Sequence, residues 1–202
     1  FYYGLAIGTS VLCAQYWGKG DHQTVERILG LATKIVLLIS LLFFVVSFFF
    51  PEYIMHLFTN SPETIEEGVT YLRVLSFSFV FMGFAQIFVS ALRSVGKVVF
   101  PSVIYVVSLL VNVFLNATFI FGLFGAPKLG VVGVALGTVT ARAVEAVLCL
   151  IYSAGSKEIR FRVETMFQRS GVLFKDFLKI SAPSVINDLV WGLAASMFTV
   201  IL

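Results

Sequence analysis

Long uncharged apolar runs alternate with short polar stretches along the chain. About 20 helical residues cross the roughly 30 Å hydrocarbon core of a bilayer, and six runs reach or approach that length. Their apolar residues are continuous instead of alternating every second position, which predicts helices and not strands. The six predicted spans are Phe1–Trp17, Ile28–Phe50, Val69–Leu92, Val99–Phe121, Val131–Tyr152 and Ala182–Leu202.

A polar stripe interrupts the fourth predicted span. Ser108, Asn112 and Asn116 follow one another at intervals of four residues, so a helix places them on one face. In a bilayer such a face must meet other helices or a water-filled cavity. Asparagine oxygens suit a hard cation such as Na⁺. We interpret Asn112 and Asn116 as candidate residues for transient Na⁺ binding and Ser108 as a candidate lining residue of a substrate cavity. Interhelical hydrogen bonding without a transport role is the alternative.

The fifth predicted span contains two opposite charges, Arg142 and Glu145. Their spacing of three residues lets them pair on a helix, and either charge alone would cost several kcal/mol in hydrocarbon. A structural ion pair is the first interpretation, and titration of Glu145 during transport is the second. Gly133 and Gly137 share a face with Glu145 and predict close approach of a neighbouring helix.

The sixth predicted span contains a solitary carboxylate, Asp188, with no basic residue within one helical turn. A lone acid in a membrane helix suits a proton carrier, although a buried and hydrogen-bonded acid is the alternative. Trp191, one turn later, can form the wall of a pocket for a flat organic cation, or simply pack against lipid or protein. Pro101 and Pro183 lie near predicted span starts, where a missing N–H costs little, and we expect them to mark helix beginnings.

The composition agrees with a polytopic all-α membrane protein. Of the 202 residues, 59% are hydrophobic and only 12% are charged, whereas soluble domains have about 25% charged residues. The net charge of +3 does not suggest nucleic acid as a partner. Isolated Cys13, Cys149, His22 and His56 predict neither a disulfide framework nor a metal centre. We find no nucleophile with a partnered base and no phosphate-binding glycine loop, so we do not expect an enzyme.

The distribution of Lys and Arg predicts the sidedness of the chain. These residues gather in the first, third and fifth connections, while the second has none and the fourth has only Lys128. Positive connections stay in the cytoplasm, so these three are predicted to be cytoplasmic. We divide the chain into an incomplete five-span bundle (1–152), a basic cytoplasmic linker (153–181) and the first span of a second bundle (182–202). Within the linker, 167–180 forms either an amphipathic surface helix or a basic loop. Both chain ends lie within apolar runs, so we expect a longer protein.

Several short motifs follow one another in a fixed order between Gly4 and Glu145. No single one is specific, but their order and spacing resemble those of the multidrug and toxic compound extrusion (MATE) family of transporters. The motifs are Ala14–Asp21, Leu92–Lys97 with Pro101, Asn112 with Asn116, Phe119–Gly122, and Pro127–Ala135 with Thr138 and Arg142 after it.

This resemblance implies a fold and a function. Members of the family have twelve helices in two bundles, and the six spans here resemble helices two to seven. The family exports organic, often cationic compounds in exchange for Na⁺ or H⁺, without a resident cofactor. Asn112 and Asn116 match a pair that helps form the cation site in some members. There the second position is often an aspartate, whereas the neutral amide of Asn116 cannot carry a proton.

We therefore expect a secondary active antiporter that exports small organic compounds by alternating access. It would be a multi-pass protein of the plasma or inner cell membrane, in contact with lipid and acting as a monomer. The first alternative is a flippase for lipid-linked sugars, which would need basic residues facing anionic headgroups, and only Arg142 is central. The second alternative is a membrane scaffold that transports nothing.

Overall fold

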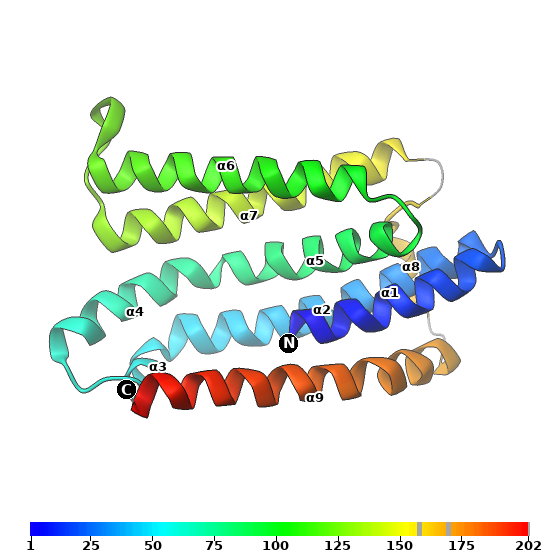
Figure 1. Cartoon of the computed structure of the whole chain (residues 1–202), viewed down its shortest axis with the longest axis horizontal. Helices are drawn as coiled ribbons and strands as arrows, with labels where there is room; N and C mark the ends of the chain where they lie inside the picture. The colour runs from blue at the N-terminus through cyan, green and yellow to red at the C-terminus, as the bar shows by residue number, and fades with distance from the viewer. Residues whose placement is uncertain (157–158, 169–170, 202) are drawn as a thin grey trace. The chain divides into compact units, whose positions relative to one another are not determined.

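The described part of the chain consists of helices and connecting loops, without strands. The computed structural model describes residues 1–156, 159–168 and 171–201, and only the main chain at residues 124 and 198–201. The all-α prediction is confirmed. In order (Figure 1), the elements are α1 (Tyr2–Gly18), α2 (His22–Phe49), α3 (Pro51–His56), α4 (Pro62–Ser76), α5 (Ser78–Ser94), α6 (Val99–Phe121), the 3₁₀ turn η1 (Leu123–Gly125), α7 (Gly130–Gly155), α8 (Val163–Phe167) and α9 (Gly171–Ile201).

Three of the described helices, α2, α6 and α7, are long and apolar enough to cross a membrane. The 23 residues of α6 extend for about 35 Å at 1.5 Å per residue, which exceeds the hydrocarbon thickness. Helices α4 and α5 provide a fourth span if the bent pair counts as one. The chain is therefore a multi-pass membrane protein. Helices α1 and α9 are outside this set, so the spans predicted at Phe1–Trp17 and Ala182–Leu202 remain predictions.

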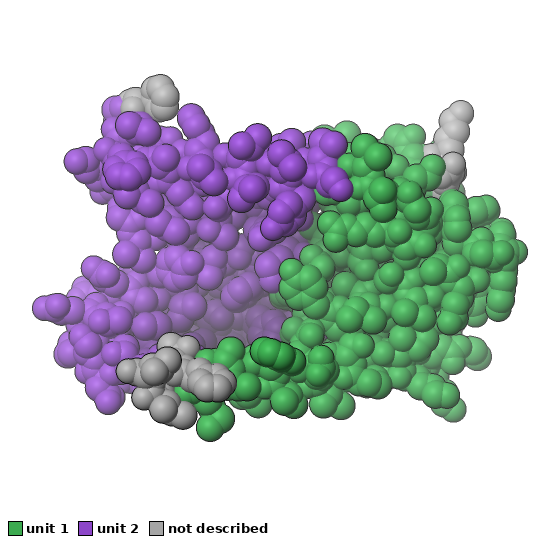
Figure 2. Space-filling view, viewed as in Figure 1, with its two compact units in different colours: residues 1–37, 83–101, 149–202 green, residues 38–82, 102–148 purple. Residues whose placement is uncertain are grey.

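The chain forms two compact units, coloured separately in Figure 2. The first comprises residues 1–37, 83–101 and 149–202, and the second comprises 38–82 and 102–148. Several helices contribute residues to both units. The division into bundle, linker and second bundle remains a prediction. Lys157, Glu158, Arg169 and Ser170 of the predicted linker, and Leu202 of the last predicted span, lie outside the described residues.

In the first unit, α1 packs directly on α9. Small residues make this contact possible, because Gly8 faces the side chain of Ser181 and Gly4 faces the main chain of Val185. A Cβ atom built on Gly4 would lie 2.6 Å from the Val185 nitrogen, closer than real Cβ contacts allow. The two glycines thus bring the helix backbones close enough for extensive van der Waals contact.

The turn between α1 and α2 is shaped by residues of the Ala14–Asp21 motif. Gly20 adopts a left-handed conformation with φ of 74°, which glycine tolerates best. Asp21 follows and accepts hydrogen bonds from the Thr24 N–H at 3.0 Å and the Thr24 hydroxyl at 2.6 Å. These bonds favour the charged carboxylate and lower the pKa of Asp21 below its usual value. This part of the motif therefore has a structural role at the start of α2.

The third predicted span, Val69–Leu92, is not a single straight helix. Helix α4 begins earlier, at Pro62, and α5 follows α4 with a bend of 46° at Phe77. Serine hydroxyls flank the bend. Ser76 donates to the Arg73 carbonyl and Ser78 to the Leu75 carbonyl, both at 2.7 Å. Such bonds to main-chain oxygens bend helices, which explains why hydrophobicity alone predicted a straight span.

The prediction that Pro183 marks a helix beginning is wrong, whereas Pro101 does lie in the first turn of α6. Helix α9 begins at Gly171 and continues through Pro183. Its first turns are anchored by Phe177, which is fully buried in the first unit. This packing continues the helix although Pro183 supplies no N–H, and residues 171–180 join α9 instead of forming a separate surface helix.

We predict that Gly4→Ala destabilises the protein by about 1–3 kcal/mol, because the added methyl group overpacks the α1–α9 contact. Gly192→Ala is the matched control, since Gly192 lies in α9, the other helix of this contact, and a Cβ there meets nothing within 4 Å. Thermal unfolding of the full-length protein in detergent measures both variants. Equal melting temperatures for Gly4→Ala and Gly192→Ala would contradict the close contact.

Candidate functional site

The candidate site lies in the second unit, where α6 and α7 pack side by side (Figure 1). Gly122 ends α6 with φ of 71°, and the Leu129 N–H donates to the Phe119 carbonyl at 3.1 Å. This turn brings α7 back along α6. A Cβ on Gly133 would lie 2.5 Å from the Phe119 Cβ, and one on Gly137 would collide with the Asn116 amide. The neighbour expected at Gly133 and Gly137 is therefore α6.

The polar stripe of α6 forms hydrogen bonds along itself and across to α7. The Asn116 Nδ2 donates to the Asn112 Oδ1 at 3.1 Å, and the Asn112 Nδ2 donates to the Thr138 hydroxyl at 3.3 Å. That hydroxyl in turn donates to the Val134 carbonyl at 3.0 Å. Each group therefore donates to the next one in the series. Asn112 accepts with its amide oxygen and donates with its amide nitrogen.

One atom of this network has no partner. The Asn116 Oδ1 is buried without a hydrogen bond and lies against Gly137. A buried unsatisfied polar atom costs about 1–3 kcal/mol, so a hydrogen-bond donor or a cation that reached this oxygen would be stabilised by it. Yet the described residues contain no group of three or more His, Cys, Asp or Glu that could hold a metal ion. Asn112 and Asn116 alone give an incomplete set of ligands for Na⁺.

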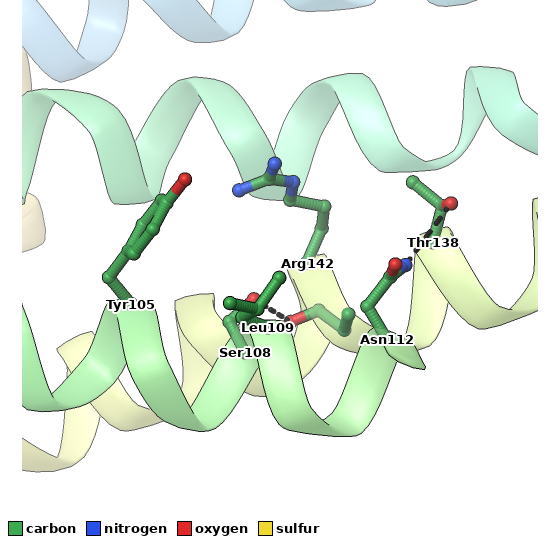
Figure 3. A pocket seen from close by; sticks show the side chains of 7 residues that line it. Tyr105, Ser108, Leu109, Asn112, Thr138 and Arg142 are labelled. Atoms are coloured by element: carbon green, nitrogen blue, oxygen red, sulfur yellow. Dashed lines mark hydrogen bonds between the residues drawn. The ribbon is translucent and has the colours of Figure 1, made fainter. Parts of the chain in front are cut away.

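A cavity of about 170 Å³ opens beside the network (Figure 3). The Ser108 hydroxyl, at its wall, donates to the Ala141 carbonyl across the helix pair at 3.2 Å. Sequence reasoning missed Tyr105, although it lies three residues before Ser108 on the same helix face. The cavity is lined by Tyr105, Ser108, Leu109, Asn112, Thr138, Ala141 and Arg142.

The two charges of α7 form a direct contact, with the Arg142 Nη1 at 2.7 Å from the Glu145 Oε2. Their surroundings differ. The Glu145 side chain is 8% exposed, while that of Arg142 is 34% exposed and lines the cavity. The pair therefore presents its positive member to the cavity and buries its negative member. The roles predicted for Arg142 and Glu145 in coupling and structure remain predictions.

Asp188 and Trp191 belong to the first unit and not to this cavity. The Gly4 N–H donates to the Asp188 Oδ2 at 2.8 Å, so the carboxylate has a main-chain partner. The Trp191 side chain is largely exposed. The structure thus brings Ser108, Asn112, Asn116 and Arg142 together, and it gives Asp188 and Trp191 a different environment.

Comparison with known proteins identifies the family. The MatE family model matches residues 1–118, more than half of the chain. The chain belongs to the MatE family. This confirms the assignment to multidrug and toxic compound extrusion transporters that the motif order predicted.

Two curated relatives of this MatE chain cover almost all of it. The probable multidrug resistance protein YoeA of Bacillus subtilis is 25% identical over 197 residues, which is 96% of this chain and 42% of that protein. The probable multidrug resistance protein NorM of Thermotoga maritima is 27% identical over 206 residues, with coverages of 98% and 42%. The MatE chain therefore spans about two fifths of the length of these relatives.

Solved structures show the same fold. A MOP superfamily transporter from Pyrococcus furiosus superposes with a TM-score of 0.85 at 21% identity, over 96% of this chain and 42% of that one. A MATE family transporter in an inward-facing conformation superposes with a TM-score of 0.80 at 21% identity, over 91% and 41%. The helix arrangement of the MatE chain is thus one found in solved transporters.

We predict a measurable coupling between Asn112 and Thr138. In a double-mutant cycle with Asn112→Ala and Thr138→Val, the coupling energy should be about 0.6 kcal/mol, the average for hydrogen bonds between membrane helices. Thr118→Val supplies the control cycle, because its hydroxyl donates to the Phe114 carbonyl of its own helix. Unfolding in detergent gives the free energies. Coupling in the Thr138 cycle no larger than in the Thr118 cycle would contradict the hydrogen bond.

Proposed function

We propose that the full-length protein is a secondary active antiporter, which exports small organic compounds in exchange for Na⁺ or H⁺. The observation that supports this most is the polar network of Asn112, Asn116 and Thr138 beside a cavity in an apolar helix pair. Polar groups at membrane depth generally mark the path of an ion or substrate. Family membership and the multidrug resistance names of the relatives support the same function.

The proposed mechanism is alternating access with competition between ion and substrate. Binding of Na⁺ or H⁺ favours one conformation, and binding of the organic compound favours the other. Each ligand has to bind the two states with different affinity, since a ligand with equal affinity for both shifts nothing. No resident cofactor is needed for this cycle, and we propose that a single copy of the protein completes it.

The residues available for coupling fall into two chemical classes. Asn112 and Asn116 are neutral amides, whose oxygens can bind Na⁺ but cannot carry a proton. Glu145 and Asp188 are carboxylates, which can titrate. Proton coupling would therefore pass through Glu145 or Asp188, and Na⁺ coupling would use the amide pair.

A flippase for lipid-linked sugars is the second candidate. One observation favours it, because Arg142 lines the cavity with a positive charge that suits an anionic headgroup. In both candidates the protein lies in the cell membrane. We propose that its first, third and fifth connections face the cytoplasm, following the distribution of Lys and Arg.

Alanine variants of the full-length protein in vesicles test the antiporter. We predict that Asn112→Ala, Asn116→Ala, Glu145→Ala or Asp188→Ala, made singly, lowers ion-driven efflux of an organic dye. At least one of these variants should lower the efflux about fivefold or more. A factor of about five corresponds to the smallest coupling energies typical of such sites. Asn187→Ala is the matched control, because it removes an exposed amide beside Asp188.

Efflux is measured under an imposed Na⁺ or H⁺ gradient, applied separately to identify the coupling ion. Unchanged efflux in all four variants would remove these residues from the mechanism. No ion-dependent flux in the unaltered protein would exclude the antiporter and leave the flippase and the scaffold.

A further inference from the structure

Arg142 faces the cavity of the second unit, while the acid that pairs with it does not. The Arg142 side chain is among the lining residues and Glu145 is absent from them. Within the described part of the chain, the Arg142 guanidinium makes one ion pair, in which Nη1 lies 2.7 Å from the Glu145 Oε2. A guanidinium has five N–H donors in a planar fork that matches the two oxygens of a carboxylate or phosphate. The donors that Glu145 does not use remain available on the cavity side.

Most other polar lining groups already donate their hydrogen bonds to protein acceptors, so Arg142 is the group available to bind a charged ligand. The Ser108 hydroxyl proton is directed to the Ala141 carbonyl, and the Asn112 amide is directed to Thr138. The exception is Tyr105, a residue that is 58% exposed. Figure 3 shows Tyr105 and Arg142 extending from α6 and α7 toward the same side of the helix pair. A phenol O–H that lines the same cavity as the guanidinium is a second donor for an oxyanion.

The lining of the cavity carries a net positive charge. Arg142 is its only formally charged side chain, and no carboxylate is among the seven residues. An organic cation placed against Arg142 would be repelled by the guanidinium, and its charge would meet no carboxylate among the seven lining residues.

The volume limits what part of a ligand can enter. Pockets for whole drug-sized molecules measure roughly 300–1,000 Å³. The cavity here is about 170 Å³, large enough for a headgroup but not for an aromatic compound of drug size. The described lining therefore suits one end of a larger molecule.

We infer that Arg142, assisted by Tyr105, binds an oxyanion, so that this cavity selects organic compounds bearing a carboxylate, sulfonate or phosphate group. The inference assigns a ligand class to the cavity, and for transport it rests on the proposed function. It differs from the first interpretation of Arg142, in which the residue only neutralises Glu145.

Equilibrium binding to the purified full-length protein tests the assignment with two dyes of one scaffold. Fluorescein carries a carboxylate and is anionic, while rhodamine 123 carries an ester and is cationic. Fluorescence anisotropy should show that Arg142→Gln/Glu145→Gln weakens fluorescein binding about tenfold or more, as expected for loss of a charge-assisted hydrogen bond. Replacing both partners avoids leaving the buried Glu145 unpaired, so this variant should fold.

Further variants separate charge from packing. Arg142→Lys should retain part of the fluorescein affinity because the charge remains, and Tyr105→Phe should weaken binding severalfold. Glu145→Gln alone should tighten fluorescein binding, because it removes the opposing carboxylate. Lys175→Gln, which removes an exposed cation of α9 in the first unit, should change nothing. Unchanged fluorescein affinity in Arg142→Gln/Glu145→Gln, or an equal loss of rhodamine 123 binding, would overturn the inference.

Competition identifies the source of the oxyanion. Displacement of fluorescein by benzoate indicates soluble organic acids, and stronger displacement by farnesyl pyrophosphate indicates lipid-linked headgroups; failure of both to displace it would overturn the inference. Arg142-dependent fluorescein binding without ion-driven efflux would support this inference while refuting the antiporter. Ion-driven efflux of rhodamine 123 with no Arg142-dependent anion binding would support the antiporter and overturn this inference.

Discussion

Polar side chains in a membrane helix have to satisfy one another, because hydrocarbon offers them no water. On α6 and α7 this constraint accounts for most of the described site. Asn116 donates to Asn112, and Asn112 donates to Thr138. The Thr138 hydroxyl in turn donates to a main-chain carbonyl of its own helix. The buried Asn116 oxygen is the exception. Such an unsatisfied atom is expensive in a structural seam and reasonable where a ligand binds.

The constraint acts together with close packing. Amides can bond between two helices only if the backbones approach, and Gly133 and Gly137 allow that approach between α6 and α7. Gly4 and Gly8 do the same for α1 and α9 in the first unit. Small residues therefore set the distance between helices. At that distance, polar residues form hydrogen bonds between the helices or line a cavity.

Sequence patterns predicted what depends on local chemistry. The bounds of α6, Val99–Phe121, agree with the predicted span because an uncharged run with defined ends leaves few alternatives. The stripe of Ser108, Asn112 and Asn116 was visible from its spacing of four residues. The bend at Phe77 was missed because hydrophobicity does not reveal which carbonyl a serine hydroxyl will choose. Pro183 was misjudged because the packing of Phe177, which continues α9 past it, is a tertiary effect.

The side-chain directions within the site also depended on tertiary structure. The spacing of Arg142 and Glu145 predicts that they can pair, but not which of them is buried. In the structure Glu145 is enclosed and Arg142 lines the cavity, so a pair with no net charge gives the cavity a positive wall. Tyr105 lies on the face of Ser108, yet only the neighbouring α7 makes that face part of a cavity.

Reaction with a water-soluble thiol reagent tests most directly whether the polar face of α6 meets an aqueous cavity. The measurement uses the full-length protein in vesicles, with the buried Cys13 and Cys149 replaced by alanine and one new cysteine at Asn112 or Val113. Val113 belongs to the exposed apolar surface of α6 and serves as the lipid-facing comparison. We predict that anionic 2-sulfonatoethyl methanethiosulfonate modifies Asn112→Cys at least about tenfold faster than Val113→Cys, because thiolates form in water and not in hydrocarbon. Equal or slower modification of Asn112→Cys would show that these amides lie in a dry seam, and it would contradict an aqueous cavity at the polar face of α6.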